Sequence, residues 1–122
     1  MTPLEEGYKM IVAALWQAGL PVGGTAAYPR LAIDTVQCEE LEKGGDVCRI
    51  TASLHCLSED SMAQSFEMCG MAIDKLTKAK ATSGGWTLVA VTAENTSCMN
   101  ESIDTANTLY RATANINAII ER

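Results

Sequence analysis

The chain has 122 residues, of which 48% are hydrophobic and 20% are charged, proportions typical of one globular domain and not of a disordered chain. Nine basic and fifteen acidic residues give a net charge of −6, which argues against the basic surface that nucleic-acid-binding proteins need. No apolar run approaches the roughly 20 residues of a membrane span, and the acidic, polar start of the chain is unlike a secretory signal. We therefore expect a single acidic domain over residues 1–122 that does not associate with a membrane.

The chain opens with a predicted helix that begins after Thr2 and ends near Gly19. Thr2 and Glu5 form a Thr-x-x-Glu capping box, and Pro3 occupies the first helical position. Glycine at position 19 favours the end of a helix. The charged Glu6 is expected outside the buried face. That face is predicted from apolar residues at spacings of four, three and four: Leu4, Tyr8, Ile11 and Leu15.

A long hairpin is predicted next, with arms at residues 31–41 and 46–57. The second arm alternates between apolar and polar residues, as expected of a strand with one buried face. The first arm changes phase between Ile33 and Val36, which predicts a bulge near Asp34. The two arms are joined by a charged tip that contains two glycines, and we expect this tip to project into solvent.

The second predicted helix begins at Ser58 or Ser61, and Ser61 forms a capping box with Gln64. Gly70 lies beside the expected buried face, where a missing side chain would allow close approach to a sheet. The apolar residues of that face recur at spacings of four and three: Met62, Phe66, Cys69, Ile73 and Leu76. Three lysines near the C-terminal end complement the helix dipole or contact nucleic acid: Lys75, Lys78 and Lys80.

The remainder of the chain is predicted to hold two more strands. Residues 86–92 are rich in β-branched side chains and form a short strand. Residues 93–107 are polar and irregular and are expected to form a long loop. Residues 109–120 alternate again and form a terminal strand. This order predicts an α+β fold, a two-layer domain with a sheet of about four antiparallel or mixed strands and two amphipathic helices packed on one face.

The open second face of such a sheet carries Thr, Asn, Arg and Ser side chains in this chain. These side chains tolerate a wet or intersubunit environment, and free strand edges offer pairing sites to another subunit. We therefore expect the chain to form a homo-oligomer.

The five cysteines form no recognisable metal or disulfide pattern: Cys38, Cys48, Cys56, Cys69 and Cys98. An odd number with irregular spacing favours reduced thiols. No Cys-x-x-Cys pair is present to begin a zinc site, so we expect neither a metal ion nor a cofactor. His55, the only histidine, precedes Cys56, but neighbouring residues of a strand point to opposite faces, so these two are not expected to form a nucleophilic pair.

In the order and lengths of its elements, the chain resembles the tail-terminator, or tail-completion, proteins of long-tailed phages and prophages. The resemblance covers about residues 4–122. It is carried by the opening helix, the Tyr28-Pro29 entry into the hairpin, and the arginine-bearing strand at 48–56. This strand leads through Ser-Glu-Asp-Ser-x-Ala at 58–63 into the second helix, and the chain closes with a strand that begins Leu-Tyr-Arg at 109–111.

The resemblance implies a structural protein of the head–tail joint, without enzymatic activity. Members of this family form rings, typically hexamers, that cap the tail tube and join it to the head connector. The implied partners are therefore further copies of the chain, tail-tube proteins and head-connector proteins, with DNA only as passing cargo. The implied location is the host cytoplasm during assembly and then the virion. An acidic ring suits DNA passage, because a lumen that bound phosphates would retain the DNA.

Contacts with neighbouring subunits or tail proteins are expected at two polar segments, the hairpin tip and the predicted loop at 93–107. The candidate residues are Glu39, Glu40, Glu42, Lys43, Asp46, Glu94, Asn95, Asn100, Glu101 and Asp104.

Two other classes of protein stay open. A ligand-binding or regulatory α+β domain that dimerises through its sheet would need a concave pocket with converging polar groups, which nothing in the sequence marks. A small enzyme would need His55 together with Asp34 or Glu59 and a cysteine, and no spacing motif supports that set. Oligomer size separates the ring-forming tail protein from the dimeric ligand-binding domain, because a ring and a dimer differ in mass.

Overall fold

The computed structural model describes residues 2–23, 28–102 and 108–122, with the backbone alone at 95–102 and 108. The elements in chain order are α1 (Pro3–Gln17), β1 (Arg30–Glu40), β2 (Val47–Ser58), α2 (Met62–Thr77), β3 (Thr82–Ser83), β4 (Trp86–Ser102) and β5 (Thr108–Glu121). Within this part of the chain, the strands form one five-stranded sheet in the order β1-β2-β5-β4-β3, with every neighbouring pair antiparallel. The expected α+β fold is confirmed, with five strands instead of about four.

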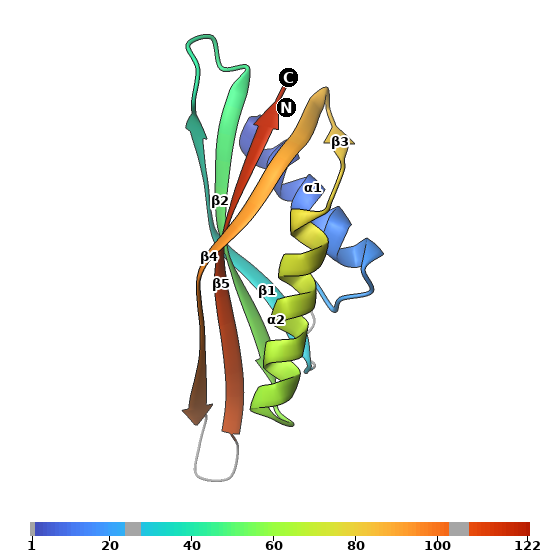
Figure 1. Cartoon of the computed structure of the whole chain (residues 1–122), viewed down its shortest axis with the longest axis vertical. Helices are drawn as coiled ribbons and strands as arrows, with labels where there is room; N and C mark the ends of the chain where they lie inside the picture. Colours follow the sequence, from blue (N-terminus) through green and yellow to red (C-terminus); the bar gives the residue numbers. More distant parts are fainter. Residues whose placement is uncertain (1, 24–27, 103–107) are drawn as a thin grey trace.

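Both helices lie on one face of the sheet and leave the other face open (Figure 1). The sheet is long, with the turn between β1 and β2 at one end and the C-terminal end of β4 at the other (Figure 1). The core lies between the helices and the sheet, where alternate residues of β2 and β5 are fully buried. In the described part of the chain, neither helix has the length and hydropathy needed to cross a membrane.

Several local predictions are confirmed. The hydroxyl of Thr2 accepts a hydrogen bond from the Glu5 N–H at 3.2 Å, and that of Ser61 accepts one from the Gln64 N–H at 3.1 Å. The pairing of β1 with β2 shifts register between Asp34 and Gln37, the expected bulge. At this bulge Thr35 has a φ of 51°, in the left-handed region that β-branched residues rarely adopt. The two caps depend on neighbours within a few residues, and the bulge appears as a change of phase in β1, so the sequence alone predicts them.

The predicted loop at residues 93–107 is wrong over 93–102, because these residues continue β4. Their pairing with β5 runs from Ala93↔Ile116 to Ser102↔Thr108. A register shift between Glu94 and Ser97 interrupts the alternation of apolar and polar residues, which is why the strand pattern is not visible in the sequence. Residues 103–107 lie outside the described part of the chain.

The predicted buried face of the first helix is wrong in part. Ile11 and Leu15 are buried, whereas Leu4 and Tyr8 are 39% and 43% exposed. The buried face instead includes Glu6, Gly7 and Met10. The reason is Gly7: a Cβ built there would lie 2.5 Å from Ile50 Cγ1, so α1 approaches β2 closely at this residue and turns its neighbours inward.

The predicted buried face of the second helix is also rotated. Cys69 and Leu76 are buried, but Phe66 is 53% exposed and Met62 is 40% exposed. The face against the sheet is made of smaller residues together with Met68: Ser65, Met68, Cys69, Ala72 and Leu76. Gly70 is exposed with no atom within 4 Å of a built Cβ, so it does not provide the close approach that we expected.

Candidate functional site

The open face of the sheet is polar and is built by cross-strand pairs. The outward residues of β2 lie opposite those of β5 in register, as Thr51↔Asn117 and Ser53↔Asn115. Ser53 Oγ donates to Asn115 Oδ1 at 3.1 Å. Two hollows mark this face; one is lined by Arg49, Ala90, Thr92, Glu94, Asn117 and Ile119, and the other by nine residues that include Gln37, Asn115 and Glu94. The face therefore offers hydrogen-bonding groups with charges of both signs.

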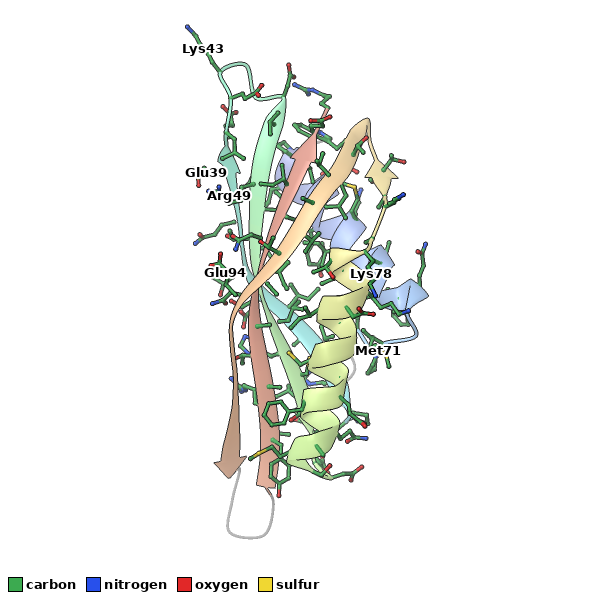
Figure 2. The ribbon with its side chains drawn as sticks, viewed as in Figure 1. Glu39, Lys43, Arg49, Met71, Lys78 and Glu94 are labelled. Carbon is green, nitrogen blue, oxygen red and sulfur yellow. The ribbon has the colours of Figure 1, made fainter. Side chains whose placement is uncertain are left out.

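Among the predicted site residues, Glu39 and Glu94 both belong to the open face. Glu39 forms an ion pair with Arg49 at 3.5 Å, and Glu94 lines a hollow with the same arginine (Figure 2). Glu39 comes from the predicted tip and Glu94 from the predicted loop, so the sheet brings one residue of each segment to a common surface. Arg49 connects them, although the sequence alone gave no reason to include it among the site residues.

The remaining tip residues lie at the β1–β2 turn, at one end of the molecule, and we refer to residues 39–46 as the tip. Glu40, Glu42 and Lys43 are exposed, and Lys43 projects farthest from the sheet (Figure 2). Asp46 Oδ1 accepts hydrogen bonds from Arg122 Nε and Nη2 at 3.3 and 3.2 Å. The Arg122 guanidinium also lies 4.9 Å from the centre of the Trp86 ring, which anchors the base of the tip to the sheet.

The residues predicted in the second segment are separated from the tip. Asn95, Asn100 and Glu101 have their backbone in β4, and Asp104 lies outside the described residues. Because β4 runs away from the tip along the sheet, its end and the tip lie at opposite ends of the molecule (Figure 1). The two predicted segments do not form one site.

The structure brings together only some of the residues considered for an enzyme: His55 and Asp34 lie side by side, but the cysteine does not join them. His55 Nε2 lies 3.1 Å from Asp34 Oδ2, across the regular pairing of β1 with β2. Cys56 points to the opposite face and is buried, as the alternation predicts. A hydrogen bond with Cys69, together with burial, raises the pKa of the Cys56 thiol, so it stays protonated. Among the described residues, no group of three histidine, cysteine, aspartate or glutamate side chains could hold a metal ion.

A second candidate surface lies on the helical layer, in a groove of about 510 Å³ between α1 and the segment that links α2 to β3. Alanines from both sides keep it open: Ala13, Ala14, Ala18, Ala79 and Ala81. Lys9, Lys75 and Lys80 also line it, with Gln17, Met10, Thr82 and Ser83. Lys75 and Lys80 form no ion pair with any residue that the structure describes. The groove, which we call the helical groove, therefore combines small apolar side chains with polar ones and with two lysines that have no ion pair in the described part of the chain.

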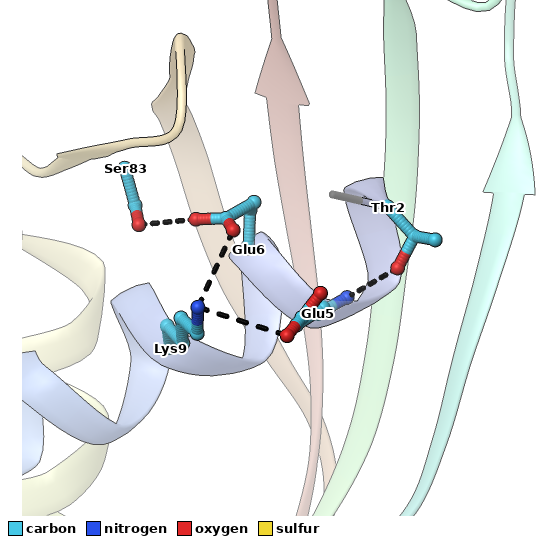
Figure 3. Close-up of polar contacts among 5 residues, drawn as sticks. All are labelled: Thr2, Glu5, Glu6, Lys9 and Ser83. Atoms are coloured by element: carbon cyan, nitrogen blue, oxygen red, sulfur yellow. Dashed lines mark hydrogen bonds and ion pairs between the residues drawn. The ribbon is translucent and has the colours of Figure 1, made fainter.

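A buried carboxylate fixes one wall of the helical groove. Glu6 is fully buried between α1 and β3, where its carboxylate accepts hydrogen bonds from the Ser83 hydroxyl and from Lys9, whose Nζ lies 3.5 Å away (Figure 3). The hydrogen bond from Ser83, with a smaller contribution from Lys9, holds the pKa of Glu6 below its ordinary value in spite of burial. Glu6 thus ties the N-terminal helix to the strand that follows α2.

Sequence reasoning missed the helical groove as a site, although it singled out two of the lysines. Lys75 and Lys80 were noted only as part of a basic cluster at a helix end. The alanines opposite them come from α1, more than 50 residues earlier. The signal that could have found them is the set of alanines at 13, 14 and 18, one to three turns after Lys9.

Comparison with protein-family models finds no match, and comparison with curated protein sequences finds none either. Comparison with solved structures finds a chain from the virion of a native gene transfer agent particle. The two chains share 14% identity and superpose with a TM-score of 0.70, over 98% of this chain and 95% of that chain. At this identity the similarity establishes a shared fold, from one end of the chain to the other.

Proposed function

We propose that this chain is a structural protein of a phage-like particle, and that it forms a ring of six copies that terminates the tail tube at the head–tail joint. The observation that carries the proposal is the end-to-end similarity of fold to a chain of a gene transfer agent virion. It spans both the helical layer and the long sheet, and 95% of the neighbour's length, so the similarity is not confined to one common motif. We infer a structural role in place of a catalytic one.

The shape of the sheet supports an assembly. β4 and β5 have 17 and 14 residues, well beyond the usual five or six of a strand. β3 covers only the first two residues of β4, so most of the outer edge of β4 has no partner strand in the described part of the chain. Sheets with free edges and an open face either protect them or use them for pairing with another subunit. Side-by-side copies would cover these surfaces.

The net charge of −6 supports passage of DNA through such a ring, since an acidic wall repels phosphates. In this proposal tail-tube and head-connector proteins are the partners above and below the ring. DNA is cargo and not a ligand. The chain is assembled in the host cytoplasm and ends in the virion.

The test is the mass of the purified chain in solution, measured by light scattering after size exclusion at several concentrations. Six copies of the 13.0 kDa chain have a mass of about 78 kDa, and negative-stain images of that species should show rings with a central channel. A second readout is peptide mass spectrometry of particles purified from the producing cells, where the chain should be present in a few copies per particle. Absence from such particles contradicts the proposal, whatever the mass of the isolated chain.

A dimeric ligand-binding or regulatory domain is the second candidate, and the helical groove favours it. Its volume of about 510 Å³ lies within the range of small-molecule sites, about 300–1,000 Å³. A constant mass of about 26 kDa at every concentration, with no higher species, is the result expected for this class.

A further inference from the structure

We propose that the tip of one copy docks into the helical groove of a second copy, with the tip carboxylates facing the lysines of the groove. This inference rests on the proposed function in one respect: the contact is the one that would join neighbouring copies in the ring.

The tip has the form of a preorganised ligand. Its turn is closed by the Leu41 N–H, which donates to the Val47 carbonyl at 2.8 Å, and by the Gly45 N–H, which donates to the Glu42 carbonyl at 3.1 Å. Arg122 holds Asp46 at the base. A segment that is already ordered loses little conformational entropy on binding.

The chemistry of the tip is apolar at one residue and acidic around it. Leu41 is 37% exposed, which leaves an aliphatic side chain in water. Glu40 and Glu42 form no ion pair with the described residues, whereas Glu39 and Asp46 are held by arginines. The tip thus presents an aliphatic anchor with two free carboxylates, against the single positive charge of Lys43.

The helical groove has the complementary chemistry. Its alanine floor can receive an aliphatic side chain, and Lys75 and Lys80 are exposed beside it without carboxylate partners in the described part of the chain. Lys9 is already paired with Glu5 and Glu6, at 3.7 and 3.5 Å. In a chain of net charge −6, the two lysines of this groove without ion pairs, Lys75 and Lys80, attract an acidic segment.

The tip and the helical groove lie on different parts of the molecule, so the same contact can be repeated from one copy to the next. The tip lies at one end of the sheet, whereas α1 and the segment from α2 to β3, which line the groove, lie in the helical layer on one face of the sheet (Figure 1). Each copy therefore offers a tip to one neighbour and a groove to another, which is a heterologous contact. Such contacts build a ring when the rotation closes.

The experiment uses single charge reversals in the full chain, with association measured by sedimentation velocity. Glu42→Lys changes the tip and Lys80→Glu changes the groove. Glu67→Lys, at an exposed site of α2, and Lys78→Glu, at the exposed residue that follows α2, are controls that do not line the groove and that alter the net charge equally. Circular dichroism of all four variants confirms that each is folded.

We expect each reversal at the contact to raise the dissociation constant at least about tenfold, because it places like charges together. The two controls should associate like the unchanged chain. An equimolar mixture of Glu42→Lys and Lys80→Glu should recover association, since each reversed tip then meets a reversed groove and each native tip a native groove. Recovery on mixing is a result that a folding defect cannot imitate.

Several outcomes overturn the inference. One is a chain that remains monomeric up to about 1 mM. Another is a pair of variants that associate like their controls, and a third is loss of association without recovery on mixing. Rings that persist in both variants contradict the tip contact and leave the proposed function standing. A dimer that depends on the tip and the groove, with no ring, supports the contact and contradicts the proposed function. Weakening by Lys80→Glu alone, with no effect of Glu42→Lys, means that the groove meets something other than the tip, and it overturns the contact.

Discussion

Gly7 of α1 packs directly against Ile50 of β2: a Cβ built on Gly7 would lie 2.5 Å from Ile50 Cγ1 and 3.1 Å from its Cδ1. Ile50 is fully buried and β-branched, so its side chain cannot easily move aside. This contact determines which residues of α1 face the core.

We expect Gly7→Ala to destabilise the protein by about 1–3 kcal/mol, because an added methyl group in a packed core forces its neighbours to shift. Gly70→Ala is the matched control. It lies in the interior of α2 with open space around it, and alanine is favoured there by about 0.5–1 kcal/mol. Chemical denaturation measures both changes. A Gly7→Ala protein as stable as the unchanged chain would show that α1 does not pack this closely on β2.

The pKa of Glu6 predicts an acid-sensitive attachment of α1 to β3. Because the folded pKa lies below the ordinary value of 4.5, the ionised carboxylate stabilises the fold above that pH, and the contribution is lost as the pH falls through the folded pKa. Glu6→Gln should therefore be less stable than the unchanged chain at pH 7, with a difference that shrinks below about pH 4.5. Urea denaturation from pH 7 to pH 3 measures it.

Ser83→Ala tests the cause of this shift. The Ser83 hydrogen bond is the largest influence that lowers the pKa of Glu6, so its removal should bring the folded pKa closer to the unfolded value and reduce the stability that is lost on acidification. An unchanged pH profile in Ser83→Ala would contradict the role of this hydrogen bond.

Phe66 points outward, so its replacement should cost little stability, whereas the apolar spacing in the sequence predicts a buried residue and a large cost. With 53% of its surface exposed, Phe66→Ala should change the free energy of unfolding by less than about 1 kcal/mol. Leu76→Ala, at a fully buried residue of the same helix, should cost about 2–5 kcal/mol. Thermal and chemical denaturation of the two variants compare them directly, and equal losses would mean that α2 presents a different face to the sheet.

The thiols should be slow to react in the folded protein. Partial desolvation of its sulfur and the neighbouring Cys48 raise the pKa of Cys38, an exposed residue, to about 11 from an ordinary 9.0. Since the thiolate is the reactive form, iodoacetamide should label Cys38 at pH 8 about a hundredfold more slowly than a free model thiol. The buried Cys48, Cys56 and Cys69 should be labelled only after unfolding. Rapid labelling of any of these four, mapped by mass spectrometry, would revive the enzyme alternative.

Local signals in the sequence determined most of the secondary structure of this protein and its fold class. Helix starts depend on side chains within three residues of the cap, as at Thr2 and Ser61, and a strand such as β2 displays its buried face in its alternation. The order of elements and the α+β class follow from these signals. The exposed position of the tip could also be predicted, because a charged turn that contains glycines and joins two strands is expected in solvent.

Only the tertiary structure decided how these elements meet. The rotation of α1 and α2 depends on close contacts such as Gly7 with Ile50, which residue spacing does not encode. The extension of β4 to Ser102 depends on its pairing with β5 across a bulge. The helical groove exists because Lys75 and Lys80 come to lie beside alanines of a helix far away in the chain. Several arrangements of the helices and strands satisfy the same local pattern, and packing between distant segments selects one of them. The helical groove and the open face of the sheet exist only in that arrangement.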